Sequence, residues 1–409
     1  MMSLWRKVDS SQSWQDVSRH RRNRSLTMKK RLLIALILIL ALLASCAQSD
    51  NNEYKRSKAT AHLLKKEHRI KIAAAGPWES NANLLMDGLK LALDEVNSSG
   101  GVLGAQVELV PVDDHNMLYT GGLAAYQIAS DPQICAVIGH SYSALSISNS
   151  IIYHFYGLLM FSPYSTNPVL TKQGLPYVFR NIPDDDATAR KAAQFCEKMG
   201  WRKVVIYYLN NAYGTGLANA FEIQSGNVLD RVSYENSYSN AEHAAVAQSW
   251  LNNYEFDAVF MAGLWPNTSE IVSVFRENGI NVPIIDGGEF DDPEFFKFPG
   301  TRNENNLYTV TPNNEYSEKP AFVAFKSAFR AKYGKEPDIA ARQGYDALKV
   351  LTKAMDNAKS VRAADVAKAL RAERWNEGAG PYRFDGNGDI TNYTLYVKKA
   401  ENGAFKVIE

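Results

Sequence analysis

The sequence predicts an α/β protein made of two lobes, each built on a doubly wound, mainly parallel sheet. The chain has 409 residues, more than one ordinary domain needs. From Arg69 onward, short β-rich runs alternate with amphipathic helical stretches, and the alternation begins again near Lys203. Because strands that alternate with helices form parallel sheets covered by helices, two such series predict two sheets.

The first series runs from residue 69 to about residue 161. Within it, Leu85, Leu89 and Val96 share one face of a predicted helix, as amphipathic spacing requires. The expected strands are 70–75, 107–112, 134–138 and 158–161, and the expected helices are 84–97, 119–129 and 143–155.

The second series supplies strands at 203–208, 232–235, 258–261, 283–285 and 306–310, with helices at 187–199, 214–223, 241–252 and 267–279. Helices at 317–333, 341–357 and 363–373 are expected to return to the first lobe, and strands near 382–384 and 393–399 close the chain. No low-complexity linker separates the halves, so several crossings of the chain should form a hinge. The predicted lobes are 69–181 plus 313–380, and 182–312 plus 381–409.

The N-terminus has the organisation of a secretory signal. A basic run, 29–31, precedes an apolar run, 32–44. The apolar run is shorter than the roughly 20 residues that span a bilayer. Residues 28–45 are therefore predicted to be the core of a signal peptide, and residues 1–27 an extension from a start site placed too far upstream.

The signal ends in Leu43-Ala44-Ser45-Cys46, which resembles the bacterial lipobox. That resemblance implies removal of residues 1–45 and lipidation of Cys46, with the polar segment 46–68 as a flexible stalk. Ala47 at the next position implies the outer membrane in a Gram-negative envelope. The alternative is an ordinary signal peptide that happens to end in cysteine.

Charge is distributed unevenly along the chain. The totals are 45 Lys+Arg and 44 Asp+Glu, but residues 1–46 hold nine basic and two acidic residues, leaving a formal charge of −6 on the remainder. An acidic body of this kind argues against a nucleic-acid partner. Cys135 and Cys196 lie in apolar runs and are interpreted as buried thiols, with a disulfide between them left open.

The turn after the third expected strand is a candidate anion site. Gly139-His140-Ser141-Tyr142-Ser143 joins a strand to a helix, with Ser143 where an N-cap would stand. Free N–H groups and the helix dipole favour a carboxylate there, with serine hydroxyls as further donors. The alternative, that Ser143 only caps its own helix, is compatible with this role.

The turn after the fourth strand, residues 162–168, is rich in hydroxyl groups and contains two prolines. Thr166 is expected to donate to the same carboxylate, and the carbonyl of Tyr164 to accept from an ammonium group. Taken alone, this turn would be interpreted as a polar surface loop.

These turns belong to a series of landmarks that resembles one family: the branched-chain amino-acid (Leu/Ile/Val) binding proteins, type I periplasmic binding proteins of ABC importers. The landmarks follow the family's order between about residue 69 and residue 390. They are Asn97-Ser98-Ser99-Gly100-Gly101-Val102-Leu103-Gly104, Val137-Ile138-Gly139-His140, Ser162-Pro163, Thr166-Asn167-Pro168, Phe179-Arg180, Pro183-Asp184-Asp185, Ala212-Tyr213-Gly214 and Gly380-Pro381-Tyr382-Arg383-Phe384-Asp385.

The resemblance implies two lobes joined by three crossovers, which close on an amino acid or related ligand. It implies that Ser143 and Thr166 hold the ligand carboxylate, that the Tyr164 carbonyl and Glu289 hold its ammonium group, and that Tyr213 lines the pocket. It also implies a monomeric receptor that serves an ABC permease, with no cofactor, no metal and no catalytic residue.

Two departures affect the expected ligand. The loop 76–81 is shorter than in the family, so either Trp78 covers the ligand or Trp78 belongs to the core. Leu264, beside Trp265, stands where an aromatic wall residue is usual. A ligand without an amino group therefore stays open, and the alternatives to Glu289 are Asp286, Asp291 and Asp292.

Other motifs are interpreted as structural. Ser141 and Ser143 approach a hydrolase elbow, which gives a remote serine-hydrolase alternative without a placed His and acid. Residues 385–389 imitate a calcium loop, but Ile390 stands where the loop requires Gly and Tyr396 where it requires Glu. The acids 184–186 are expected to cap a helix. A signalling receptor with the same fold is the main alternative to transport.

Overall fold

The computed structural model describes residue 34 and residues 48–79, 83–292, 294–297, 306–314, 317–378 and 380–409. Contacts divide the chain into two units, residues 1–54 and 55–409. In the first unit, residues 48–54 are helical. The predicted signal peptide lies outside the described residues except for Ile34, and Cys46 lies outside them.

The first sheet of the second unit has five parallel strands in the order β2-β1-β3-β4-β5. Side chains of β1 alternate between its two faces, with Ile70 and Ile72 in one core and Ala73 and Ala75 in the other. The strands are β1 (Arg69–Gly76), β2 (Gln106–Asp113), β3 (Ile134–Ile138), β4 (Leu159–Ser162) and β5 (Val178–Arg180).

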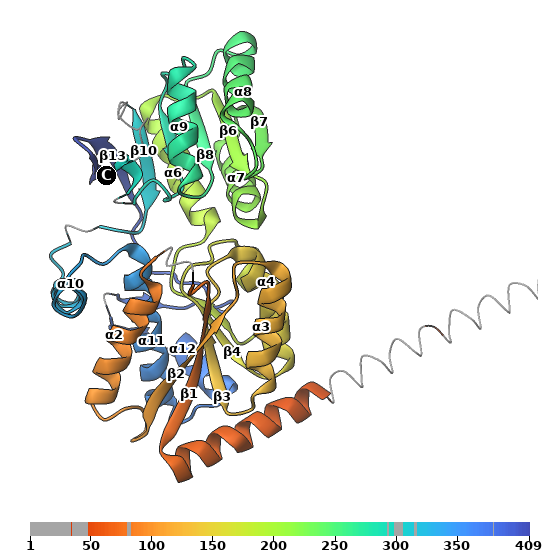
Figure 1. The fold of residues 1–409 in the computed structure, drawn as a ribbon, viewed down its shortest axis with the longest axis vertical. Coiled ribbons are helices and arrows are strands. Elements are labelled where there is room, and N and C mark those ends of the chain that lie inside the picture. Colours follow the sequence, from red (N-terminus) through yellow and green to blue (C-terminus); the bar gives the residue numbers. More distant parts are fainter. Residues whose placement is uncertain are drawn as a thin grey trace, which may run out of the picture. The chain divides into compact units, whose positions relative to one another are not determined.

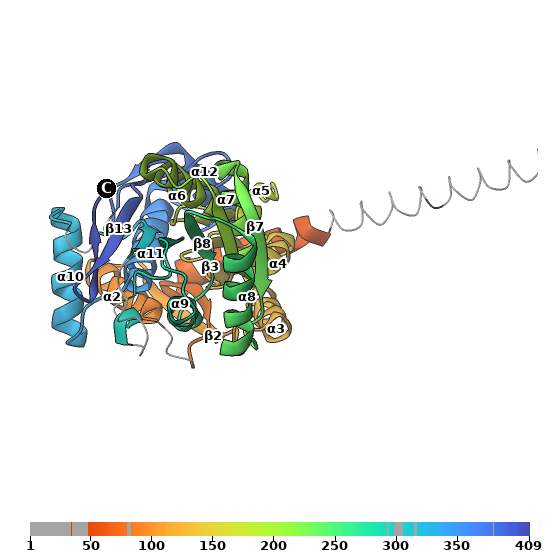
Figure 2. The same cartoon turned by 90° about the horizontal axis from the view of Figure 1, so that it is seen from above.

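Helices cover both faces of this sheet. The pair α2 and α11 packs on one face with α12, and the pair α3 and α4 packs on the other (Figure 1). The short helix α5 follows β4, and α10 lies beside α2 (Figure 2). The helices are α2 (Leu85–Ser98), α3 (Leu118–Ser130), α4 (Ser143–Phe155), α5 (Val169–Lys172), α10 (Pro320–Tyr333), α11 (Ile339–Ala358) and α12 (Ala363–Ala372).

The second sheet has seven strands in the order β14-β13-β10-β9-β8-β6-β7. The strands from β6 to β10 pair in parallel, whereas β13 and β14 are antiparallel. The strands are β6 (Val204–Leu209), β7 (Val228–Tyr234), β8 (Ala258–Ala262), β9 (Ile284–Asp286), β10 (Leu307–Thr311), β13 (Tyr396–Glu401) and β14 (Ala404–Val407).

Two helices cover each face of this sheet. Val204 and Ile206 share a core with α6 and α7, whereas Val205 and Tyr207 share one with α8 and α9. A 3₁₀ turn, Phe295–Lys297, follows β9. The helices are α6 (Asp185–Met199), α7 (Ala212–Ser225), α8 (Asn240–Asn253) and α9 (Asn267–Glu277). The predicted class, two α/β lobes with mainly parallel sheets, is confirmed.

The chain passes between the two sheets three times. It leaves the first sheet after β5, returns after β10 to place α10–α12 against the first sheet, and leaves again before β13. A small antiparallel pair, β11 (Arg374–Trp375) and β12 (Tyr382–Arg383), precedes the last crossing. The short strands β5, β11 and β14 were not predicted.

The segment before β1 differs from the flexible stalk that its polar composition predicts. Residues 55–62 are helical and continue into a π-helical turn, Leu63–Glu67. The buried guanidinium of Arg56 donates to the carbonyls of Ala129, Asp131, Ile134 and Tyr156, at the base of the first sheet. These hydrogen bonds hold the segment in place.

Both described cysteines are buried and free, Cys135 in the core of the first sheet and Cys196 in that of the second. Burial raises the pKa of each thiol to about 12. Within the described residues, every helix falls short of the length and apolar composition that crossing a bilayer requires.

Candidate ligand-binding site

A cavity of about 520 Å³ lies where turns after the strands of both sheets approach one another. Ligands of open α/β sheets bind at such carboxyl ends. Of the seven side chains predicted to bind ligand, six line the cavity: Ser143, Tyr164, Thr166, Tyr213, Leu264 and Glu289. The structure therefore brings together residues that are far apart in the sequence.

The first wall is the turn between β3 and α4. Gly139 has φ of 146°, and a Cβ there would lie 2.3 Å from the carbonyl oxygen of Ala75, so only glycine fits. Tyr142 is the N-cap residue and Ser143 the first helical residue, so the cap lies one position earlier than predicted. No side chain caps this helix, so its first N–H groups stay without a capping partner, and Ser143 lines the cavity.

A buried network behind the turn fixes its position. The imidazole of His140 lies 2.7 Å from an Asp114 carboxylate oxygen and 2.9 Å from the Tyr153 hydroxyl, and all three are buried. Ser146 and Ser165 each donate to the His140 carbonyl at 3.2 Å, which ties this turn to the next one. The imidazole is thus occupied inside the lobe and is not paired with a serine of the cavity.

The second turn continues this wall with Tyr164 and Thr166. The Thr166 hydroxyl contacts the carboxyl of Asp185, whose N–H donates to the Thr166 carbonyl at 2.9 Å. Burial raises the pKa of Asp185 to about 7. Asn167 reaches across to the other lobe, donating to the carbonyl of Ala212 at 2.6 Å. Asp184, predicted to be a cap, accepts from the N–H of Ala187 at the start of α6.

The opposite wall presents a carboxylate without a cationic partner among the described residues. Glu289 follows β9, and its carboxylate accepts from the N–H of Trp265 at 3.2 Å. Burial, with a smaller effect of Asp292, raises the pKa of Glu289 to about 7. Gly288, with φ of 121°, permits the turn, and Asp286 holds it by accepting from the N–H of Glu289 at 2.7 Å.

A second acid of this wall, Asp291, is already neutralised. The fully buried ammonium group of Lys398 lies 2.8 Å from one of its oxygens and 2.9 Å from the other. Among the predicted alternatives to Glu289, Asp286 is buried below the turn and Asp291 has this partner. Asp292 also lines the cavity, but one of its carboxylate oxygens accepts from the N–H of Glu294 at 2.7 Å. Glu289 is therefore the carboxylate of this wall best placed to meet a ligand cation.

The remaining lining contains both apolar and polar side chains. Leu264, Trp265 and Phe296 come from the second lobe, and Tyr213 lies in the first turn of α7. Sequence reasoning missed the part of the lining that comes from the second crossing and from α10 and α11: Pro312, Asn313, Phe322, Phe325, Lys326, Asp338 and Arg342. Helical periodicity could identify those helices, but not the face that meets the other lobe.

Trp78, expected either to cover the ligand or to join the core, lies against the core. Its indole donates to the carbonyl of Ala74 at 3.0 Å, and its ring packs beside the first-sheet core. Gly76 makes room, since a Cβ there would lie 2.7 Å from the indole ring. Pro77, not Trp78, lines the cavity. A loop this short turns the indole back onto its own strand.

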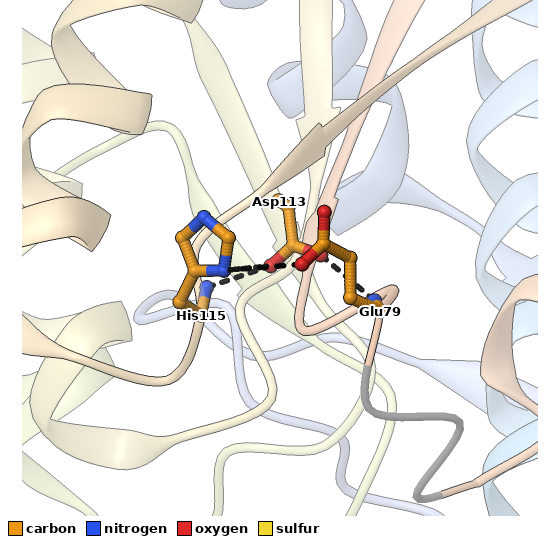
Figure 3. Close-up of side chains that lie close together, drawn as sticks. All are labelled: Glu79, Asp113 and His115. Atoms are coloured by element: carbon orange, nitrogen blue, oxygen red, sulfur yellow. Dashed lines mark hydrogen bonds and ion pairs between the residues drawn. The ribbon is translucent and has the colours of Figure 1, made fainter.

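Three side chains with metal-ligand chemistry lie together at the ends of β1 and β2, outside the cavity lining (Figure 3). The ligand atoms of Glu79, Asp113 and His115 lie within 4.8 Å of one another. The Glu79 side chain is 82% exposed, and Asp113 accepts from the N–H groups of Glu79 and His115. This arrangement ties the two loops together, and exposed groups of this kind often gather without an ion.

Comparison with known proteins agrees with this architecture. The family model described as "Periplasmic binding protein" matches residues 72–404. The Leu/Ile/Val-binding protein BraC3 of Rhizobium johnstonii is 27% identical over 82% of this chain and 91% of its own length. The leucine-, isoleucine-, valine-, threonine- and alanine-binding protein of Pseudomonas aeruginosa is 26% identical over 80% of this chain and 89% of its own length.

Solved structures extend the comparison. An ABC transporter substrate-binding protein of Desulfitobacterium hafniense, in complex with Leu, is 34% identical with a TM-score of 0.74, covering 83% of this chain and all of that one. The transporter substrate-binding protein LivJ of Streptococcus pneumoniae, in complex with isoleucine, is 25% identical with a TM-score of 0.73, covering 83% and 98%. This chain therefore belongs to the periplasmic binding protein family, as the ordered landmarks of its sequence predicted.

Proposed function

We propose that this protein captures a zwitterionic amino acid with an apolar side chain, such as leucine, and delivers it to an ABC importer. The observation that carries the proposal is the opposed chemistry of one cavity. Ser143, Thr166 and the start of α4 offer donors on one wall, and Glu289 offers a carboxylate on the other. The names of the relatives, which bind leucine, isoleucine and valine, support the same ligand class.

A ligand that bridges the two walls favours lobe closure. Its carboxylate interacts with one lobe and its ammonium group with the other, so both interactions form together only when the lobes approach. Charge-assisted hydrogen bonds in a closed cleft are stronger than neutral ones. Leu264, Trp265 and Phe296 supply an apolar surface for the side chain. Closure around ligand would thus give the importer a distinct form of the receptor to recognise.

The proposal extends to the cell envelope. The lipobox-like end of the signal supports cleavage before Cys46 and diacylation of that thiol, which would tether a monomeric receptor near its permease. Mass spectrometry of the protein from a bacterial host tests this directly. Cys46→Ser should abolish lipid addition and membrane retention, and an unmodified Cys46 in membrane-bound protein would contradict the anchor.

The ligand itself is tested by calorimetric titration and thermal unfolding of the purified chain with single amino acids. A ligand that binds only the folded state raises the unfolding midpoint. Leucine, isoleucine or valine should bind, and 4-methylpentanoate, which is leucine without its amino group, should bind far more weakly. Equal binding of the two would remove the proposed role of Glu289 and leave the receptor with an amine-free acid as its ligand.

A further inference from the structure

A second cavity, of about 380 Å³, lies among the three crossings of the chain. Asn181 and Pro183 come from the first crossing, Pro312 from the second, and Asn392 from the third. Volumes of this size are typical of small-molecule sites. Its lining also includes Lys319, Phe322, Arg342, Gln343, Arg374 and Tyr382.

The charge of this hinge cavity is opposite to that of the ligand cleft. Its lining contains three basic side chains, Lys319, Arg342 and Arg374, and no Asp or Glu. The cleft is lined by five acidic residues, Glu289, Asp291, Asp292, Glu336 and Asp338. Within the described ranges, none of the three basic side chains makes an ion pair. Asp346 lies one turn beyond Arg342 on α11, and its carboxylate accepts from the Tyr382 hydroxyl at 2.5 Å. The hinge cavity therefore favours an anion.

Buried polar atoms without partners also face this cavity. The side chains of Asn181 and Gln343 are both 1% exposed, and neither Asn181 Oδ1 nor Gln343 Oε1 has a hydrogen-bond partner in the described chain. The amide of Asn181 is oriented by its own Nδ2, which donates to the Gln343 carbonyl at 3.0 Å. Asn392 Oδ1 and Arg342 Nε are also buried without a partner. Such groups are costly unless a bound molecule satisfies them.

We propose that the hinge cavity is a second binding site, for a small organic anion that also carries hydroxyl groups. The anionic group pairs with Arg342, whose planar guanidinium suits a carboxylate or a phosphate equally. Hydroxyl hydrogens of the same molecule donate to Asn181 Oδ1 and Gln343 Oε1, and the rings of Tyr382 and Phe322 cover its carbon skeleton.

Because of its location, an occupant of this site can change how readily the lobes close over the cleft. All three crossings line it, so its contacts change when the lobes rotate, and an occupant that prefers one arrangement shifts the equilibrium between them. Arg342, Phe322, Pro183 and Pro312 line both cavities. This coupling, unlike the site itself, rests on the proposed capture of an amino acid by closure. The two affinities must then change each other by the same factor.

Pairs of probes that share an anionic group but differ in hydroxyl groups test the two kinds of contact separately. Malate differs from succinate by one hydroxyl group, and glycerol phosphate differs from inorganic phosphate by its hydroxylated carbon chain. Calorimetric titration of the full chain at constant ionic strength should give binding of malate or glycerol phosphate several-fold tighter than of its partner probe. Identical heats for all four probes and sodium chloride would overturn the proposal.

Variants assign the binding to the cavity. Arg342→Gln should weaken the hydroxylated probe by roughly tenfold to a hundredfold, the usual effect of losing a charge-assisted bond. Gln343→Leu should abolish the preference for malate over succinate without lowering the unfolding midpoint, because it removes a buried acceptor that lacks a partner. Lys368→Gln, at an exposed lysine outside both cavities, is the matched control and should bind like the wild type. Binding that survives both Arg342→Gln and Gln343→Leu would place the probes elsewhere.

The same titrations with leucine distinguish this inference from the proposed function. Leucine binding without probe binding would overturn the hinge site and leave the receptor intact. Probe binding without leucine binding would do the reverse. Where both bind, the leucine affinity should change several-fold when malate saturates the hinge, and an unchanged affinity would overturn the coupling.

Discussion

The two walls of the ligand cleft carry their polarity in different ways. On the first-sheet side, the N–H groups at the start of α4 and the hydroxyl of Ser143 offer donors that stay donors at any physiological pH. On the second-sheet side, burial raises the pKa of Glu289 from 4.5 to about 7. One wall is thus fixed in its preference for an anion, whereas the other gains full charge only when pH rises or a ligand cation stabilises it.

Of all substitutions in the two walls, one at Glu289 should change leucine affinity most. Glu289→Gln keeps the shape of the wall but removes its charge, so leucine affinity should fall about a hundredfold or more, the cost of leaving a buried ammonium without its carboxylate. Calorimetric titration measures the change. Glu294→Gln, an exposed position in the same loop outside the cavity lining, is the control. A loss below threefold would show that the second wall is not the ammonium site.

A smaller change in leucine affinity should appear when pH changes the ionisation of Glu289. Because Glu289 must ionise to pair with ammonium, leucine affinity should weaken about tenfold between about pH 8 and about pH 6. The ammonium and carboxylate of leucine keep their charges over this interval. Titrations at several pH values provide the measurement, and Glu289→Gln should make the affinity nearly independent of pH. A wild-type affinity that is flat with pH would contradict a titrating wall.

Stability without ligand should change with pH in the opposite direction. The folded-state pKa of Glu289, about 7, lies above its ordinary value of 4.5, so the folded state binds more protons over that interval. The free energy of unfolding contributed by this group therefore falls as pH rises from about 4.5 to about 7. Asp286, with a pKa raised to about 8 by burial, extends the trend. Denaturant titrations of the ligand-free chain should show this decline, and Glu289→Gln should reduce it.

The first wall should tolerate single changes better, because several donors share the anion. Ser143→Ala removes a hydroxyl but keeps the N–H groups at the start of α4, so leucine affinity should fall about tenfold. Ser148→Ala, where the exposed hydroxyl only bonds to carbonyls of its own helix, should bind like the wild type. Calorimetric titration of both variants compares them. A hundredfold loss at Ser143 would mean that the hydroxyl, not the helix start, holds the carboxylate.

Most of this architecture could be predicted from the sequence, because the patterns that determine it lie within short stretches of the chain. Strands such as 134–138 and helices such as α4 show their periodicity within a few residues, so they were found close to their observed ends. Turns that line the cavity carry local signals too, such as Gly139 before a helix start. The ordered landmarks then indicated the family, which the comparisons confirm.

What the sequence did not predict depends on long-range contacts. The cleft surface from α10 and α11 exists only because the second crossing brings those helices back beside the first lobe. The buried pairing of Lys398 with Asp291 joins positions more than a hundred residues apart, and no spacing rule connects them. The helix at residues 55–62 likewise depends on carbonyls near residues 129–156 that accept from Arg56.

Trp78 and Trp265 provide the last and smallest test, because either indole could cover the bound ligand. Trp78 donates to Ala74 and packs on the core, whereas Trp265 lines the cavity beside Glu289. Trp78→Phe should therefore lower the free energy of unfolding by about 1 kcal/mol, through one lost hydrogen bond and some packing, and change leucine affinity less than twofold. Trp265→Phe should do the reverse and weaken binding several-fold, since it alters the apolar lining next to the ammonium site. Denaturant unfolding and calorimetric titration of both variants measure the two quantities. If Trp78→Phe weakened leucine binding more than Trp265→Phe did, the indole of Trp78 would have to leave the core and cover the bound ligand.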